Sequence, residues 1–158
     1  RRGAECRERG RSLHTVNVPS RRHPPRTRGT GCKEVAAIAS ILVVEDDADV
    51  AQLIQHRLAA SGHEVAVAGD GEQGLVAARD ARPSLVILDW MMPHRTGLEV
   101  CAELRGDASF AGTRIMMLTA RAQDEDIARA FSAGADDYMT KPFSPRELVA
   151  RVGALLAS

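Results

Sequence analysis

Short apolar segments alternate with amphipathic segments along the chain from residue 40 onward. Runs of four to six residues rich in Val, Ile, Leu and Met predict strands at 40–45, 64–68, 84–89, 114–119 and 137–140. Between them, apolar residues recur at helical spacing and predict helices at about 48–61, 71–81, 97–105, 122–133 and 144–156. Three of the strands are almost wholly apolar, as strands covered on both faces must be. The pattern therefore predicts an α/β fold, a doubly wound five-stranded parallel sheet with strand order 2-1-3-4-5.

Local signals support these helices. The i, i+3, i+4, i+7, i+8 pattern of the first helix predicts a core-facing stripe of Val50, Leu53, Ile54, Arg57 and Leu58, with the Arg57 stem able to lie over apolar surface. Ser144 followed by proline predicts an N-cap and a first helical position for the last helix.

The composition changes at about residue 38. Residues 1–38 hold 10 of the 21 basic and three of the 21 acidic residues, so residues 39–158 carry 11 basic and 18 acidic groups, a net charge of −7. Residues 1–34 lack Phe, Trp, Tyr, Ile and Met and cannot bury enough apolar surface to offset their ordering entropy. We expect a disordered basic N-terminal extension at 1–38 and one folded domain at 39–158. The extension is interpreted either as an arm for nucleic acid or an acidic partner or, as we favour, as non-functional.

Several classes of protein are disfavoured. The acidic domain is not expected to contact nucleic acid directly, because its field repels phosphates. No apolar run approaches the ~20 residues of a membrane helix. Cys6, Cys32 and Cys101 are odd in number and lack metal-ligand spacing, which fits a reducing cytoplasm. A twin-arginine export signal is rejected, because the residues after Arg21 and Arg22 are polar or proline rather than apolar.

Polar residues follow four of the predicted strands. Glu45 and Asp46 end the first, Asp89 the third, Thr119 the fourth and Lys141 the fifth. Ligands of doubly wound sheets bind outside the carboxyl ends of the strands, so these groups should converge. Clustered carboxylates repel one another unless a cation joins them, and Mg²⁺ prefers such oxygen ligands.

The predicted metal ligands are the side chains of Glu45, Asp46 and Asp89 and the backbone carbonyl of Met91. Asp47 and Asp49 are interpreted as capping or solvated residues of the first helix. Lys141 is the only lysine in residues 39–158, which favours a specific role over that of an ordinary surface lysine.

Four motifs in the chain resemble those of a known protein family. Ile-Leu-Val-Val-Glu-Asp-Asp at 41–47, Leu-Asp-Trp-Met-Met-Pro at 88–93, Leu-Thr-Ala at 118–120 and Gly-Ala-Asp-Asp-Tyr-Met-Thr-Lys-Pro-Phe at 134–143 resemble the receiver domain of bacterial two-component response regulators. The resemblance covers residues 40–157 and is closest to the receivers of winged-helix transcriptional regulators. It implies the flavodoxin-like receiver fold.

The resemblance also implies a phosphorylation switch and not an enzyme acting on other molecules. A sensor histidine kinase or a small phosphodonor would transfer a phosphoryl group to Asp89, with Mg²⁺ and Lys141 stabilising charge on the transferring group. Thr119 and Tyr138 would be the switch residues. The Lys141–Pro142 bond is expected to be cis, as in the family.

The readout would use the face formed by the fourth helix, the fifth strand and the fifth helix, through which phosphorylated relatives dimerise. Asp137, Glu147 and Arg151 match interface positions, but Ile127 replaces a basic partner of Glu147, so one contact is expected to be lost. Because the last predicted helix ends close to Ser158, we expect either a single-domain regulator or part of a longer one.

Other functions fit less well. A phosphorylation-independent docking module with the same fold is the main alternative, and the intact set of site residues disfavours it. A hydrolase of the haloacid dehalogenase type needs a second acid two residues after the nucleophile, where this chain has Met91. A nicotinamide-binding enzyme is weaker still, because no G-x-G-x-x-G follows the first strand.

Overall fold

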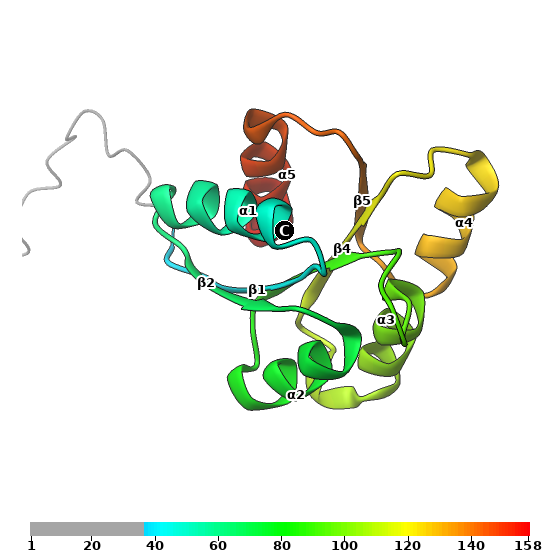
Figure 1. The fold of residues 1–158 in the computed structure, drawn as a ribbon. Helices are drawn as coiled ribbons and strands as arrows, with labels where there is room; N and C mark the ends of the chain where they lie inside the picture. The colour runs from blue at the N-terminus through cyan, green and yellow to red at the C-terminus, as the bar shows by residue number, and fades with distance from the viewer. Residues whose placement is uncertain (1–36) are drawn as a thin grey trace, which may run out of the picture. The chain divides into compact units, whose positions relative to one another are not determined.

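A computed structural model describes residues 37–158, which form a five-stranded parallel sheet flanked by helices (Figure 1). The strands are β1 (Ser40–Val44), β2 (Glu64–Ala68), β3 (Leu85–Asp89), β4 (Arg114–Thr119) and β5 (Asp137–Thr140). Their order is β2-β1-β3-β4-β5, and every pair of neighbours is parallel. The predicted topology is confirmed. The predicted extension lies outside the described residues, apart from its last two positions, and its disorder stays a prediction.

The helices are α1 (Ala48–Ala60), α2 (Gly71–Ala81), α3 (Gly97–Gly106), α4 (Asp124–Ser132) and α5 (Pro145–Ala157), with a short 3-10 helix, η1 (Ala108–Phe110). Ser144 caps α5 by accepting the Glu147 N–H, as predicted. Helix α4 begins two residues after its predicted approximate start at residue 122, and its N-cap, Gln123, makes no side-chain cap hydrogen bond. Within residues 37–158, no helix has the length and apolar character needed to cross a membrane.

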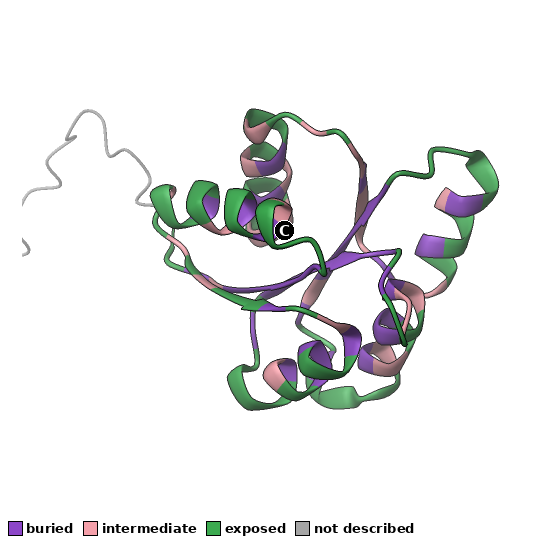
Figure 2. Cartoon of the chain, in the orientation of Figure 1, coloured by how far each residue is buried: buried purple, intermediate pink, exposed green. Residues whose placement is uncertain are grey.

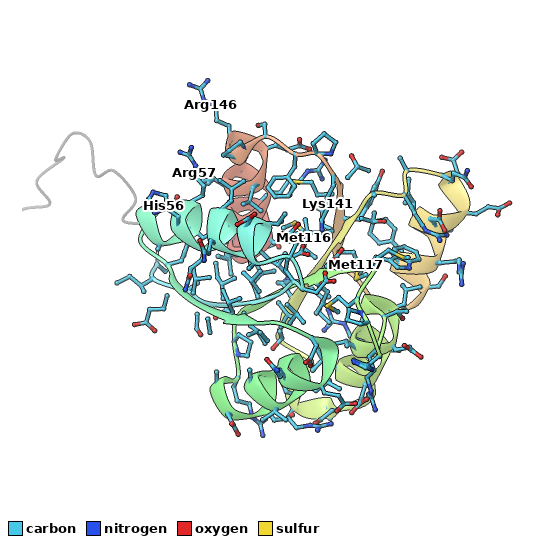
Figure 3. All side chains as sticks on the ribbon, viewed as in Figure 1. His56, Arg57, Met116, Met117, Lys141 and Arg146 are labelled. Atoms are coloured by element: carbon cyan, nitrogen blue, oxygen red, sulfur yellow. The ribbon has the colours of Figure 1, made fainter. Side chains whose placement is uncertain are left out.

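Two apolar cores lie on opposite faces of the sheet. Helices α1 and α5 cover one face, and α2 and α3 cover the other, with α4 at the β5 end of the sheet (Figure 1). Successive strand residues alternate between the cores, as Met116 and Met117 of β4 show (Figure 3). Strands β1, β3 and β4 are almost wholly buried, whereas β2, at an edge, is largely exposed (Figure 2). The uniformly apolar runs of the sequence therefore mark the strands that have neighbours on both sides.

One detail of α1 differs from the prediction. Ala51, Ile54 and Leu58 form its buried stripe, whereas Leu53 is 41% exposed. The helix is rotated so that its small residue faces the sheet. Leu53 instead turns toward the β5–α5 loop, beside Pro142 and Phe143.

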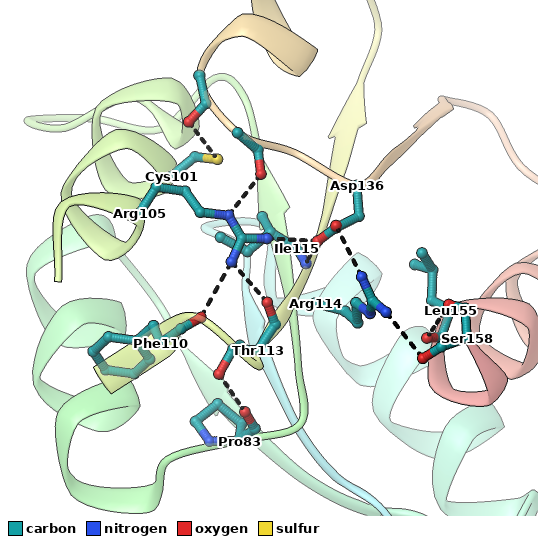
Figure 4. A network of polar contacts seen from close by, with 12 residues as sticks. Pro83, Cys101, Arg105, Phe110, Thr113, Arg114, Ile115, Asp136, Leu155 and Ser158 are labelled. Carbon is teal, nitrogen blue, oxygen red and sulfur yellow. Dashed lines mark hydrogen bonds and ion pairs between the residues drawn. The ribbon is translucent and has the colours of Figure 1, made fainter. Parts of the chain in front are cut away.

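A polar network joins the ends of elements far from the carboxyl ends of the strands (Figure 4). Arg105 of α3 donates to the carbonyls of Gly134, Phe110 and Thr113 and forms an ion pair with Asp136 at 2.5 Å. Gly134 has φ +103°, and a Cβ there would overlap the Arg105 side chain. The end of α4 is therefore fixed to α3, while its uncapped beginning faces the opposite side of the domain.

Candidate functional site

The parallel register brings the predicted acids together. Val44 of β1 is aligned with Leu88 of β3, so Glu45 and Asp89, the residues that follow, lie side by side at the carboxyl ends of the strands. The backbone N–H of Glu45 donates to Ala68 O at 3.0 Å, which keeps this residue in line with the strand. Both carboxylates are buried, at 2% and 5% exposure. Two buried carboxylates this close together need a cation beside them, because removing their charges from water is costly.

Lys141 supplies that partner within the protein. Its Nζ lies 2.7 Å from Glu45 Oε2 and 3.2 Å from Asp89 Oδ1 (Figure 3 labels Lys141). The Lys141–Pro142 bond is cis, as predicted, and the Lys141 N–H donates to Thr119 O at 2.7 Å. One ammonium therefore bridges the acids of two strands from the end of a third.

Asp46 completes an acidic cluster. Carboxylate oxygens of Glu45, Asp46 and Asp89 lie within 4.8 Å of one another, the one such group in residues 37–158. Asp46 is exposed, so the cluster opens to solvent. Asp47, by contrast, caps α1 by accepting the N–H groups of Asp49 and Val50, as predicted.

Burial has the largest effect on the pKa values of the site residues. It raises the pKa of Glu45 from 4.5 to about 7, although the hydrogen bond from Lys141 opposes the shift. Burial likewise raises the pKa of Asp89 against the attraction of Lys141. Burial alone would lower the pKa of Lys141, but the hydrogen bond to Glu45 and the charge of Asp89 raise it overall. The site therefore holds more acid than one lysine can compensate.

The loop after β3 carries features that sequence reasoning missed. Trp90 N–H donates to Leu118 O, and Gly97 N–H closes the loop by donating to Trp90 O. A Cβ at Gly97 would overlap the carbonyl oxygen of Asp89. The signal was a glycine eight positions after the acid, at the start of a predicted helix. Met91, whose carbonyl is a predicted ligand, lies in this loop with its side chain 56% exposed.

The two predicted switch residues lie on neighbouring strands. Thr119 is buried, and its Oγ1 accepts the Arg121 N–H at 2.9 Å, so its hydroxyl proton remains available to another acceptor. Tyr138 is half-buried, and its ring meets Phe131 edge-on at 6.0 Å between centroids. Neither side chain belongs to the ion-paired cluster of Glu45, Asp89 and Lys141.

The predicted interface residues contact one another within the domain. Arg151 Nη1 lies 3.0 Å from Asp137 Oδ1, and Arg151 Nε lies 3.0 Å from Glu147 Oε1. Ile127, where a basic residue was expected, is half-buried on α4.

An apolar hollow opens beside the lysine. It has a volume of about 360 Å³ and is lined by Val50, Leu53, Lys141, Pro142 and Phe143. A second hollow, of about 290 Å³, adjoins Glu45 and Asp46 on the side of β2. The acidic cluster therefore lies between two depressions of the surface.

Comparison with known proteins gives consistent matches. A family model described as response regulator receiver domain matches residues 41–153. The DNA-binding response regulator MtrA of Mycobacterium tuberculosis (strain ATCC 25618 / H37Rv) is 49% identical over 116 residues, 73% of this chain and 50% of MtrA. The alkaline phosphatase synthesis transcriptional regulatory protein PhoP of Bacillus subtilis (strain 168) is 47% identical over 116 residues, 73% of this chain and 48% of PhoP. The chain spans about half the length of these curated relatives.

Solved structures of other proteins have a similar fold. The chemotaxis protein CheY4 of Vibrio cholerae matches with a TM-score of 0.72 and 33% identity, covering 75% of this chain and 99% of the CheY4 chain. A response regulator structure from Chloroflexus aurantiacus J-10-fl matches with a TM-score of 0.73 and 36% identity, covering 77% of this chain and 99% of its own. The predicted flavodoxin-like receiver fold is confirmed, as is the resemblance to the receivers of transcriptional regulators.

Proposed function

The chain belongs to the response regulator receiver family of two-component systems, and from that premise we propose that it is a phosphorylation-activated switch whose acceptor is Asp89. One observation carries the proposal. Lys141 Nζ contacts both Glu45 and Asp89 where three strands end, so a buried nucleophilic carboxylate lies beside a fixed positive charge. A docking module that worked without phosphorylation would have no need of this arrangement.

The donor set fits Mg²⁺. Three carboxylates converge within 4.8 Å beside one lysine, and two of them are buried, so a divalent cation would compensate the charge that the lysine leaves when they are ionised. We assign Asp46 and Asp89 as direct ligands, Glu45 as a ligand through water and Met91 as a carbonyl ligand. When bound, Mg²⁺ would neutralise charge on the phosphoryl oxygens.

The residues of the chain perform the transfer as follows. A carboxylate oxygen of Asp89 forms a bond to phosphorus while the bond from phosphorus to the donor nitrogen breaks, and the electron pair leaves with that nitrogen. The product is an acyl phosphate. Lys141, already 3.2 Å from Asp89, stabilises the charge on the transferring oxygens, which is the main contribution that phosphoryl transfer needs from a protein.

The phosphoryl group adds about −1.5 to −2 charges at the end of β3. The Thr119 hydroxyl would donate to a phosphoryl oxygen, and Tyr138 would move inward into the space that this leaves. Ala130 and Asp126 are the only residues of α4 that are buried, so this helix can shift with little loss of packing. The face of α4, β5 and α5 would carry the signal.

A sensor histidine kinase is the proposed phosphodonor, acting in the cytoplasm. The hollow lined by Val50, Leu53 and Phe143 lies beside Lys141 and offers apolar surface to the helix that presents the phosphohistidine. Phosphorylation is proposed to favour a homodimer through α4, β5 and α5, with Asp137, Glu147 and Arg151 exchanging their contacts with the partner copy. Sizing the protein with and without beryllofluoride tests this dimer, and an unchanged size would refute it.

The phosphoacceptor is tested by intact mass. Wild type incubated with phosphoramidate and Mg²⁺ should gain one phosphoryl group, and EDTA should prevent the gain. Asp89→Asn should remain unmodified, while Asp47→Asn, which changes a capping acid two residues from Glu45, should react as wild type does. An unmodified wild type, or equal modification of Asp89→Asn, would overturn the proposal.

A further inference from the structure

The loop that carries the Met91 carbonyl is weakly held by its own backbone. Trp90 N–H donates to Leu118 O at the start of the loop; after it, the backbone hydrogen bonds are Gly97 N–H to Trp90 O at 3.0 Å and Arg95 N–H to Pro93 O at 2.8 Å, besides the Thr96 cap of α3. Trp90 and Met92 are buried, but Met91 between them is exposed. A carbonyl in such a loop loses entropy when it binds a metal unless another contact fixes the loop beforehand.

Arg95 provides that contact from the far side of the loop. Its Nε lies 2.6 Å from Glu72 Oε1 in the first turn of α2, and its Nη1 pairs with Glu103 Oε2 of α3. Two edges of one guanidinium thus bind two helices, a geometry that lysine cannot reproduce. The other oxygen of Glu103 pairs with Arg79 of α2 at 2.7 Å, so these four charges form one network.

Close packing between Gly71 of α2 and Arg95 adds to the ion pairs in holding the loop. A Cβ on Gly71, the first residue of α2, would lie 2.9 Å from the Arg95 Cβ. The Arg95 Cβ therefore packs closely against the backbone of α2 at Gly71, in addition to the ion pair with Glu72. A shift of Arg95 would be transmitted to Met91, four positions away, because Pro93 stiffens the intervening chain.

We propose that Arg95 is a positioning residue that holds the β3–α3 loop against α2 and α3 and so presets the Met91 carbonyl for Mg²⁺. This inference rests on the proposed function, since it concerns the same metal site. Arg95 touches neither the metal ligands nor the phosphoryl group. Its effect should appear in metal affinity and loop mobility rather than in the rate at saturating Mg²⁺.

The matched variants are Arg95→Ala and Arg79→Ala. Both remove an ion pair of Glu103, but only the first releases the loop. Trp90 is the only tryptophan of the chain and follows Asp89 directly, so its fluorescence is the signal used to follow Mg²⁺ binding. Arg95→Ala removes both of its ion pairs and should weaken Mg²⁺ binding about two- to tenfold, whereas Arg79→Ala should weaken it less than about twofold, because exposed ion pairs contribute modestly. In 1 M NaCl the difference between the two variants should shrink.

Two further readouts separate positioning from general destabilisation. Hydrogen exchange of the metal-free protein should be faster at residues 91–96 in Arg95→Ala and unchanged there in Arg79→Ala. Phosphorylation by phosphoramidate at saturating Mg²⁺ should proceed at nearly the wild-type rate in both. If wild type binds Mg²⁺ and is phosphorylated but the two variants have equal Mg²⁺ affinity and equal exchange, the role of Arg95 is wrong while the proposed function stands. If wild type neither binds Mg²⁺ nor gains a phosphoryl group, the proposed function falls, and this inference falls with it.

Discussion

The buried carboxylate of Glu45 should make the metal-free domain less stable as the pH rises. Its pKa is raised from 4.5 to about 7 because burial disfavours the charged form. The folded state therefore holds this proton more tightly than the unfolded state. The resulting stabilisation is complete below pH 4.5 and is lost as the pH passes 7. From these two pKa values, ionising Glu45 costs the folded state about 3 kcal/mol at pH 8 but less than about 1 kcal/mol at pH 5.

Urea unfolding in EDTA at pH 5 and pH 8 measures this effect. Glu45→Gln removes the titrating group, while its amide oxygen can still accept a hydrogen bond from Lys141. Between pH 5 and pH 8, the free energy of unfolding should therefore fall by about 2 kcal/mol less in this variant than in wild type. Comparing the two proteins cancels the contributions of the groups that they share. Glu64→Gln, on an exposed acid of the edge strand β2, is the control and should keep the wild-type dependence. Equal pH dependence of Glu45→Gln and wild type would refute the reasoning.

Three further predictions follow from single contacts. Lys141→Met should slow phosphorylation by phosphoramidate roughly 100-fold at saturating Mg²⁺, because the carboxylates lose their fixed positive charge, and unchanged kinetics would refute this. Gly97→Ala should cost about 3 kcal/mol in urea unfolding, because its Cβ overlaps the Asp89 carbonyl oxygen, whereas Gly153→Ala, with open space around it, should not destabilise the domain. Burial raises the pKa of Cys101 to about 11, so in a Cys6→Ser/Cys32→Ser background iodoacetamide at pH 8 should alkylate it only after unfolding; labelling of the folded protein would contradict this.

The sequence identified the main features of the site because they follow from strand periodicity. Parallel strands end at one edge of the sheet, so acids placed after two apolar runs and a lysine after a third had to converge. Glu45, Asp89 and Lys141 do converge. The cap at Asp47 and the cis bond before Pro142 were likewise predicted from local sequence or from the family.

Other features depend on how the helices pack against the sheet and against one another, which spacing along a single sequence does not encode. Leu53 fits the helical stripe by spacing, yet the rotation of α1 places Ala51 against the sheet instead. Arg105 and Asp136 lie 31 positions apart, and Arg79 and Glu103 lie 24 apart, so their pairing depends on how α3 packs against its neighbours. The start of α4 was misplaced because Gln123 provides no side-chain cap to signal it.

Ile127 changes how strongly a homodimer through the face of α4, β5 and α5 is expected to form. With Ile127 in place of a basic residue, Glu147 has Arg151 as its ion-pair partner within the described domain, and Arg151 also binds Asp137. A homodimer through this face would therefore have to exchange existing contacts for new ones, which predicts a weaker dimer than one with a basic residue at position 127.

The most direct test of the central claim is to locate the phosphoryl group itself. Wild type phosphorylated with phosphoramidate and Mg²⁺ is reduced with borohydride, which converts an acyl phosphate but leaves free carboxylates intact, and its peptides are then sequenced by mass spectrometry. The proposed switch predicts reduction at Asp89 alone. Reduction at Asp46 or Glu45, or phosphate retained on a serine, threonine or histidine, would contradict it.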